Sequence, residues 1–178
     1  MSVEMIWEEV KRLFCTYARL YEMTKILFVC QGNICRSPMA MFYLRYRLKQ
    51  LQLDSEYEVR SAALEMSTKG SDMEALAKKQ LTENGIPFET HAAHQLNPKE
   101  FMMQNYVLYM EAFQKIQISR LMSGHGMERA HRLFDYTGVR KDIDDPYFTG
   151  DFKTAFEEIR KGVDAFVDQV ILKKGALE

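Results

Sequence analysis

The chain has 178 residues, about the length of one domain, and 47% of them are apolar, enough for a sizeable core. With 24 basic and 25 acidic residues the formal charge is −1, which gives no argument for a nucleic acid or an acidic membrane surface as partner. No run approaches the roughly 18 apolar residues of a membrane span, and nothing resembles a signal peptide. Three cysteines do not make a disulfide framework, so we expect a reducing, cytoplasmic compartment.

Residues 1–24 are predicted to form an amphipathic helix. Apolar residues recur at three- and four-residue spacing from Ile6 to Tyr21, and charged residues fall mostly on the other side. We expect this helix to cover an apolar face of its own domain. A docking or homodimer interface through residues 3–22 is the alternative, whereas the mixed charge of the polar face disfavours a membrane. Cys15 is expected to be a packed apolar residue rather than a reactive thiol.

Residues 25–52 contain the most informative stretch of the chain. Residues 26–29 are a short apolar run that predicts a buried strand, and residues 39–48 predict a helix with Pro38 in its first turn. A strand, a tight loop with one glycine and a helix start commonly bind phosphate. Successive backbone N–H groups form an anion nest there, and the helix N-terminus adds positive potential. The predicted phosphate-binding loop is Cys30-Gln31-Gly32-Asn33-Ile34-Cys35-Arg36-Ser37.

The chemistry of this loop follows from its residue types. A thiol that faces the nest, the helix end and Arg36 is expected to have a depressed pKa, which would make Cys30 a thiolate near neutral pH. Arg36 can bind two phosphate oxygens through its planar guanidinium, and Ser37 can donate a hydrogen bond to the thiolate. These residues predict attack of sulfur on phosphorus and a phosphocysteine intermediate. The alternative is a structural cysteine at a strand end and an arginine on a surface loop.

The string Cys-x-Gly-Asn-Ile-Cys-Arg-Ser-Pro near the start of a small α/β chain resembles the low-molecular-weight protein tyrosine phosphatases. The resemblance covers about residues 25–172 and implies a compact doubly wound domain that hydrolyses phosphotyrosine. The family usually begins almost directly with the first strand, so residues 1–24 depart from it. Gln31 is polar where relatives often have an apolar or small residue, which leaves the selectivity of the pocket open.

Residues 57–63 alternate weakly and predict a second strand. Its end resembles the family segment in which a serine hydroxyl supports the loop asparagine, which implies that Ser61 holds Asn33. The alternative is a serine that simply ends the strand. In the family, loop 64–72 forms part of the active-site rim and often carries an aromatic residue. None is present here, and Met66 is expected to take that place.

Ser71 or Asp72 is expected to cap a helix that runs to about Asn84, where Asn84-Gly85 stops it. The Gly-Ile-Pro segment that follows leads to His91 and resembles the family, which implies that His91 supports the phosphate loop through the same asparagine–serine network. His94 stands where many relatives carry arginine. A partly buried or surface histidine is the alternative for both, and no carboxylate or cysteine cluster beside them predicts a metal site.

A third buried strand is predicted over residues 106–110, after a short helix capped by Asn97. A helix from Glu111 to about Ser123 follows. The family commonly has aspartate after this strand, and the longer glutamate leaves the role of Glu111 open. Residues 129–134 predict the last strand, in which His131 is expected to be structural.

The second informative stretch is residues 135–150. Attack by a thiolate expels an oxygen that needs a proton, so a second group must serve as general acid. The string Asp-Pro-Tyr resembles the family's general-acid loop, which implies that Asp145 is the acid and then the base for the water that hydrolyses phosphocysteine. Tyr147 and Phe148 would line the slot for an aromatic leaving group. Asp144 is the rival acid, and a plain turn is the structural alternative.

Residues 152–172 predict an amphipathic closing helix. Strands that alternate with helices predict an α/β fold. We expect three layers, with a doubly wound, four-stranded parallel sheet, helices on both faces and an added N-terminal amphipathic helix. We expect residues 1–24 to be a helical extension and residues 25–178 to be the phosphatase domain. Ligands of such sheets bind beyond the carboxyl ends of the strands, where Cys30 is expected.

The predicted function is cysteine-dependent hydrolysis of protein phosphotyrosine without a cofactor or metal, with phosphate or a similar oxyanion in the active site. Thioredoxin-coupled arsenate reductases share the loop but need two further cysteines, and none follows Cys35. Protein arginine phosphatases tend to carry threonine where this chain has Ile34. A non-catalytic phosphate-binding module would need neither Cys30 nor Asp145. The resemblance also implies a reversible disulfide between Cys30 and Cys35, for which a small buried Cys35 is the alternative.

Overall fold

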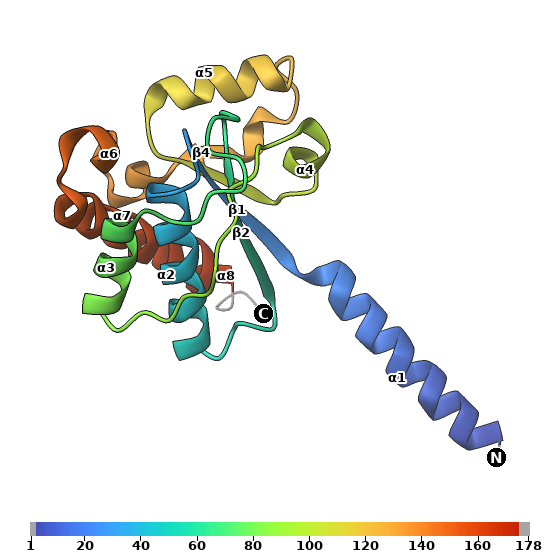
Figure 1. Ribbon diagram of the computed structural model, residues 1–178. Helices are drawn as coiled ribbons and strands as arrows, with labels where there is room; N and C mark the ends of the chain where they lie inside the picture. The colour runs from blue at the N-terminus through green and yellow to red at the C-terminus, as the bar shows by residue number, and fades with distance from the viewer. Residues whose placement is uncertain (1–2, 175–178) are drawn as a thin grey trace.

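Four parallel strands form the centre of the domain (Figure 1). The computed structural model describes residues 3–174, and it describes the side chains of residues 4–13 and 23–173. Strand β1 (Thr24–Cys30) lies between β2 (Tyr57–Ala63) and β3 (Tyr106–Tyr109), and β3 pairs with β4 (Ala130–Arg132). The sheet order is therefore β2-β1-β3-β4, as expected for a doubly wound sheet, and the connections reverse direction around β1.

Helices cover both faces of the sheet, so the predicted α/β architecture is confirmed (Figure 1). One face packs on α2 (Arg36–Gln50), α3 (Ala75–Glu83) and α7 (Phe152–Phe166), and the other on α4 (Pro98–Met102) and α5 (Ala112–Leu121). Ile26 and Phe28 point to the first face and Leu27 and Val29 to the second, all fully buried. The remaining elements are α1 (Val3–Glu22), η1 (Met127–Arg129), η2 (Leu133–Thr137), α6 (Pro146–Thr149), η3 (Val167–Ile171) and α8 (Leu172–Lys174).

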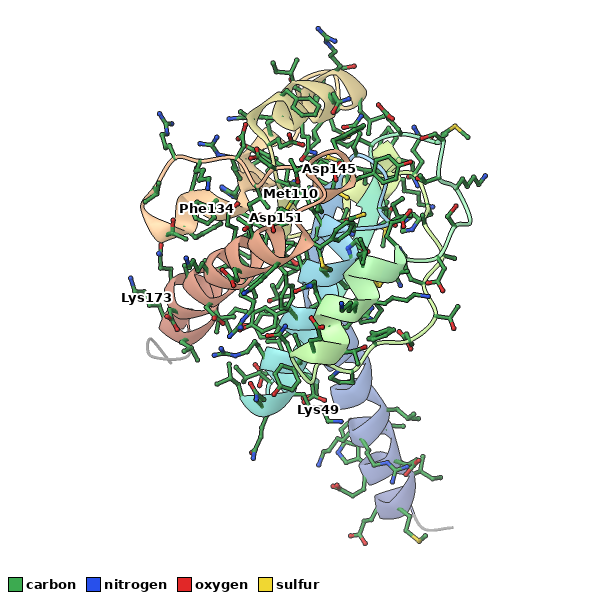
Figure 2. The ribbon with its side chains drawn as sticks, turned by 60° about the vertical axis from the view of Figure 1, so that its left-hand side comes forward. Lys49, Met110, Phe134, Asp145, Asp151 and Lys173 are labelled. Atoms are coloured by element: carbon green, nitrogen blue, oxygen red, sulfur yellow. The ribbon has the colours of Figure 1, made fainter. Side chains whose placement is uncertain are left out.

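Helix α1 does not cover its own domain, so that expectation was wrong. It extends away from the sheet in both views (Figures 1 and 2). Its described apolar side chains are between 45% and 62% exposed, and they are Met5, Ile6, Trp7, Val10 and Leu13. The physical reason is the connection, because a single residue, Met23, separates α1 from β1 and leaves no loop that could turn the helix back. The side chain of Cys15 lies outside the described side chains.

Three local expectations also need correction. Helix α3 begins after Glu74, not after Ser71 or Asp72, although Gly85 (φ 67°) ends it as expected. Strand β4 stops at Arg132, because Leu133 turns into the 3₁₀-helix η2 and packs on α7. The closing helix runs over the expected range but is interrupted by the π-helical turn η3.

Candidate active site

The Cys30 thiol lies at the carboxyl end of β1 and is 2% exposed. The backbone N–H of Asn33 donates to Cys30 Sγ over 3.3 Å, and Ser37 Oγ lies 3.0 Å from the same sulfur. The loop thus curls around the thiol before α2 begins at Arg36, which places the sulfur beside a helix N-terminus and an amide nest.

Asn33 determines which way the hydrogen bonds around the thiol run. Its Oδ1 accepts from the His94 backbone N–H (3.3 Å) and faces His91 Nε2 (3.2 Å), so its Nδ2 is directed the other way. That nitrogen donates to Ser37 Oγ and to Ser61 Oγ, each over 2.9 Å. Because Ser37 Oγ already accepts this hydrogen bond, its own proton is free to point at Cys30 Sγ.

His91 supports the loop from outside. Its Nε2 lies 2.8 Å from the Asn33 carbonyl oxygen, and both atoms that it faces are acceptors, so Nε2 carries the ring proton. Burial lowers the pKa of His91, which keeps the ring neutral. The pKa of His94 is instead raised, because its Nε2 pairs with Glu100 at 2.9 Å.

Arg36 is the most deeply buried charge of the site, with 1% of its side chain exposed. Its Nη1 donates to Glu111 Oε2 (2.5 Å) and to the Ile143 carbonyl (2.9 Å), and its Nη2 donates to Asp145 Oδ2 (2.6 Å). Burial lowers the pKa of Arg36, but the negative charges of Cys30, Asp145 and Glu111 outweigh this effect and raise it overall. Within the described part of the chain, its buried Nε has no hydrogen-bond partner, which leaves one donor for a ligand.

Asp145 reaches Arg36 because two segments far apart in sequence meet at this edge of the sheet. The Ile143 N–H donates to the Met110 carbonyl at the end of β3 (3.0 Å), and Figure 2 shows Met110 and Asp145 at the same end of the domain. Asp145 also caps α6, since its Oδ1 accepts from the Tyr147 N–H over 3.2 Å. The sequence indicated a general-acid loop over these residues, with a plain turn as the alternative, and did not predict this short helix.

A pocket of about 420 Å³ opens above the thiol. Thr68 Oγ1 donates to the Gly32 carbonyl (2.5 Å) and ties loop 64–72 to the phosphate loop. Met66 is 57% exposed and does not line the pocket, contrary to expectation. The lining residues are Cys30, Gln31, Gly32, Ile34, Cys35, Glu65, Ser67, Thr68, Ser71, Asp72, Glu74, Asp145, Tyr147 and Phe148.

Sequence reasoning missed two features of this site. Glu111 caps α5 and contacts Arg36 directly, a role that its extra methylene relative to aspartate had left open. Glu65, Asp72 and Glu74 all line the pocket. The only sequence signal for these carboxylates was that loop 64–72 was expected at the rim of the active site. Among the described residues, no group of three or more metal-ligating side chains is present.

Comparison with known proteins identifies the family. Residues 25–176 match the sequence model of the family described as low molecular weight phosphotyrosine protein phosphatase. The chain belongs to this family. The phosphatase from Bacillus subtilis named YfkJ is 30% identical over 155 residues, which cover 85% of this chain and 99% of that protein. The low molecular weight phosphotyrosine protein phosphatase of Schizosaccharomyces pombe is 31% identical over 134 residues, 72% of this chain and 85% of that one.

Solved structures of phosphatases share the fold as well. The crystal structure of Bacillus subtilis YfkJ superimposes with a TM-score of 0.82 at 27% identity, covering 85% of this chain and 97% of that one. The structure of an arginine phosphatase from Drosophila superimposes with a TM-score of 0.75 at 25% identity, over 82% of this chain and 96% of that one. This phosphatase is therefore a hydrolase of the low-molecular-weight family. In residues 3–174, no helix is both long and apolar enough to cross a membrane.

Proposed function

We propose that this phosphatase hydrolyses protein phosphotyrosine through a phosphocysteine intermediate. The observation that carries the proposal is that Cys30 and Asp145 line one pocket, while the Arg36 guanidinium, whose Nε is unpartnered among the described residues, lies 2.6 Å from the Asp145 carboxylate. A nucleophile, a cation for the developing charge and a carboxyl group for proton transfer are the parts that this reaction needs.

In the first step, Cys30 Sγ forms a bond to phosphorus while the bond from phosphorus to the tyrosine oxygen breaks. The incoming phosphoryl oxygens accept from the loop N–H groups and from Arg36, and they take the Nη2 hydrogen bond that Asp145 now accepts. Asp145, no longer paired with Arg36, takes up a proton from solvent and gives it to the leaving oxygen. In the second step Asp145 takes a proton from water, whose oxygen attacks phosphorus, and the sulfur–phosphorus bond breaks to release phosphate.

Tyr147 and Phe148 support an aromatic substrate. They are 61% and 81% exposed, and their rings meet edge to face at 5.4 Å beside the pocket. A phosphotyrosine ring can stack on such a pair. Ile34 also lines the pocket, where the side chain would contact the substrate next to its phosphoryl group.

The second candidate is arginine phosphatase activity with the same mechanism, because a structural neighbour carries that description. A non-catalytic phosphate-binding module is disfavoured by the presence of both Cys30 and Asp145. We further propose residues 25–178 as the catalytic domain, located in the cytoplasm, and the exposed apolar face of α1 as a docking or homodimer surface.

The test compares a phosphotyrosine peptide with a phosphoarginine substrate in the presence of chelator. Cys30→Ser is expected to abolish turnover of both, and Asp145→Ala to lower kcat by about 10²- to 10⁴-fold, since the leaving oxygen then lacks its proton donor. Asp144→Ala is the matched control, because Asp144 is the exposed neighbour, and turnover should change less than two-fold. Preferential hydrolysis of phosphoarginine, or no turnover of either substrate, would overturn the proposed function.

A further inference from the structure

The pocket mouth carries a charge pattern that bears on which phosphotyrosine sites can enter. Four of the lining residues are carboxylates, and none of the described lining residues is lysine or arginine. That the pocket takes an anion is indicated independently, by the N–H that Asn33 directs at the Cys30 thiol and by the buried Arg36 guanidinium that donates to Asp145, since Cys30 and Asp145 both line the pocket. A dianionic phosphoryl group must therefore pass an acidic mouth to reach its binding loop.

Two of the four carboxylates are already neutralised by neighbours. Asp145 pairs with Arg36, and Asp72 pairs with Lys78 Nζ at 2.5 Å. Hydrogen bonds from Lys78 and from the backbone N–H groups of Met73 and His91 lower the pKa of Asp72 to about 2. Neither carboxylate leaves an uncompensated charge for the substrate.

Glu65 and Glu74 are different. Neither has a basic side chain within 4.0 Å in the part of the chain that the structure describes, although the amide of Gln31 donates to Glu65. The charge of Glu74 is close enough to contribute to the raised pKa of the buried Cys35 thiol. These two glutamates, the mouth glutamates, are the unpaired negative charges at the pocket.

Backbone hydrogen bonds hold both mouth glutamates beside the phosphate loop. The N–H of Glu65 donates to the Gln31 carbonyl, and the N–H of Glu74 donates to the Ile34 carbonyl, each over 3.0 Å. Both residues are thus bonded directly to the loop that receives the phosphoryl group, and their charges face whatever flanks the phosphorylated residue.

We propose that the mouth glutamates make this phosphatase select phosphotyrosine flanked by lysine or arginine over phosphotyrosine flanked by aspartate or glutamate. A basic flank pairs with Glu65 or Glu74 and offsets the repulsion that the phosphoryl dianion meets, whereas an acidic flank adds to that repulsion. The inference rests on the proposed function and names the class of substrate for the same site.

The test uses two phosphotyrosine peptides that differ only in having two lysines or two glutamates on each side. The native enzyme is expected to show a kcat/KM about 3- to 10-fold higher on the lysine peptide, the size expected for two exposed charge pairs. The difference should shrink in 0.5 M salt, because exposed charges are screened. The double variant Glu65→Gln/Glu74→Gln should lose the preference, and Glu65→Lys/Glu74→Lys should invert it.

Glu56→Gln is the matched control, because Glu56 is an exposed glutamate at the amino end of β2, the opposite end of the sheet from the pocket, and the preference should persist. Equal kcat/KM on both peptides, or a preference that survives in the double glutamine variant, would overturn the inference. Hydrolysis of para-nitrophenyl phosphate by the native enzyme, measured beside the two peptides, distinguishes failure of the proposed selectivity from failure of the proposed function. If both peptides are hydrolysed with equal kcat/KM, the proposed function stands and the selectivity does not; if only the small substrate is hydrolysed, the proposed function itself fails.

Discussion

At the scale of single residues, Asn33 is the centre of the site. It is fully buried, its φ is 55°, and it takes part in hydrogen bonds with Ser37, Ser61, His91 and His94. A non-glycine residue in the left-handed region is unusual, but asparagine tolerates it better than most. The polar network holds this conformation, and the conformation in turn directs the Asn33 N–H at the thiol.

We expect Asn33→Ala to lower the free energy of unfolding more than Asn33→Gly, by about 1 kcal/mol, because both lose the side-chain hydrogen bonds but only alanine is strained at positive φ. Urea unfolding measures the difference. Gln52→Gly is the control, since Gln52 is exposed, has a φ of 60°, and should gain about 1 kcal/mol from relief of the same strain. Equal stability of the two Asn33 variants would contradict this account.

The histidines predict how stability depends on pH. Burial lowers the pKa of His91 in the folded state below its ordinary value of about 6.5, so the unfolded chain binds the proton first. The free energy of unfolding should therefore fall as pH drops below about 6.5. The hydrogen bond with Glu100 raises the pKa of His94 in the folded state. His94 therefore stabilises the fold fully at low pH, and this contribution is lost as pH rises.

The measurement is urea unfolding between pH 5 and 8. His91→Gln should reduce the loss of stability on the acid side, and His94→Gln should increase it, because the two shifts have opposite sign. His131, whose pKa is also lowered by burial, provides a residual slope in both variants. If the free energy of unfolding falls more steeply at low pH in His91→Gln than in the native chain, the result would contradict a lowered pKa of His91 in the folded state.

At the scale of elements, the contact between α7 and η2 explains why β4 is short. Gly162 of α7 lies so close to η2 that an added Cβ would be 2.8 Å from Leu133 Cγ and 3.3 Å from the Leu133 carbonyl oxygen. Leu133 is fully buried at this crossing. The chain leaves the sheet at Leu133 because that side chain packs against the helix rather than in the strand pattern that the sequence suggested.

Gly162→Ala is therefore expected to destabilise the domain by about 1–3 kcal/mol, as overpacking does, although alanine favours a helix by about 1 kcal/mol over glycine. Thermal unfolding measures the change. Lys161→Ala, one position earlier on the exposed side of α7, should be close to neutral. A stabilised Gly162→Ala variant would mean that η2 and α7 separate easily.

At the scale of the whole molecule, α1 and the domain are joined by one residue and share few contacts. The family match begins at residue 25, after this helix. We expect removal of residues 1–22 to leave the unfolding temperature within about 2 °C and kcat/KM within about two-fold. Calorimetry and peptide hydrolysis test this. A large loss of either would show that α1 stabilises the domain or its site.

If the exposed face of α1 is an interface, its removal should lower the mass of the protein in solution, which light scattering measures. Ile6→Ser/Leu13→Ser keeps the helix and changes only that face, because residues seven apart lie on the same side of a helix, so it should have the same effect. If the native chain, the truncated chain and the double serine variant all have the mass of a single copy, the exposed face of α1 does not mediate self-association.

What the sequence determined by itself is the local chemistry of contiguous segments. The strand, loop and helix from Thr24 to Gln50, the cap at Asn97 and the pairing of a cysteine loop with Asp145 could be predicted, because each depends on neighbouring residues or on a motif string. The parallel sheet followed from alternation of strands and helices.

The tertiary structure decided the contacts between distant segments that no motif string specifies. Glu111 and Asp145 share Arg36 across 75 and 109 residues of sequence, and the mouth glutamates come together because backbone hydrogen bonds join their segments to the phosphate loop. The direction of α1 and the end of β4 were mispredicted for the same reason. Amphipathic periodicity shows that a face is apolar, but the length of a connection and the packing of a distant helix determine what that face meets.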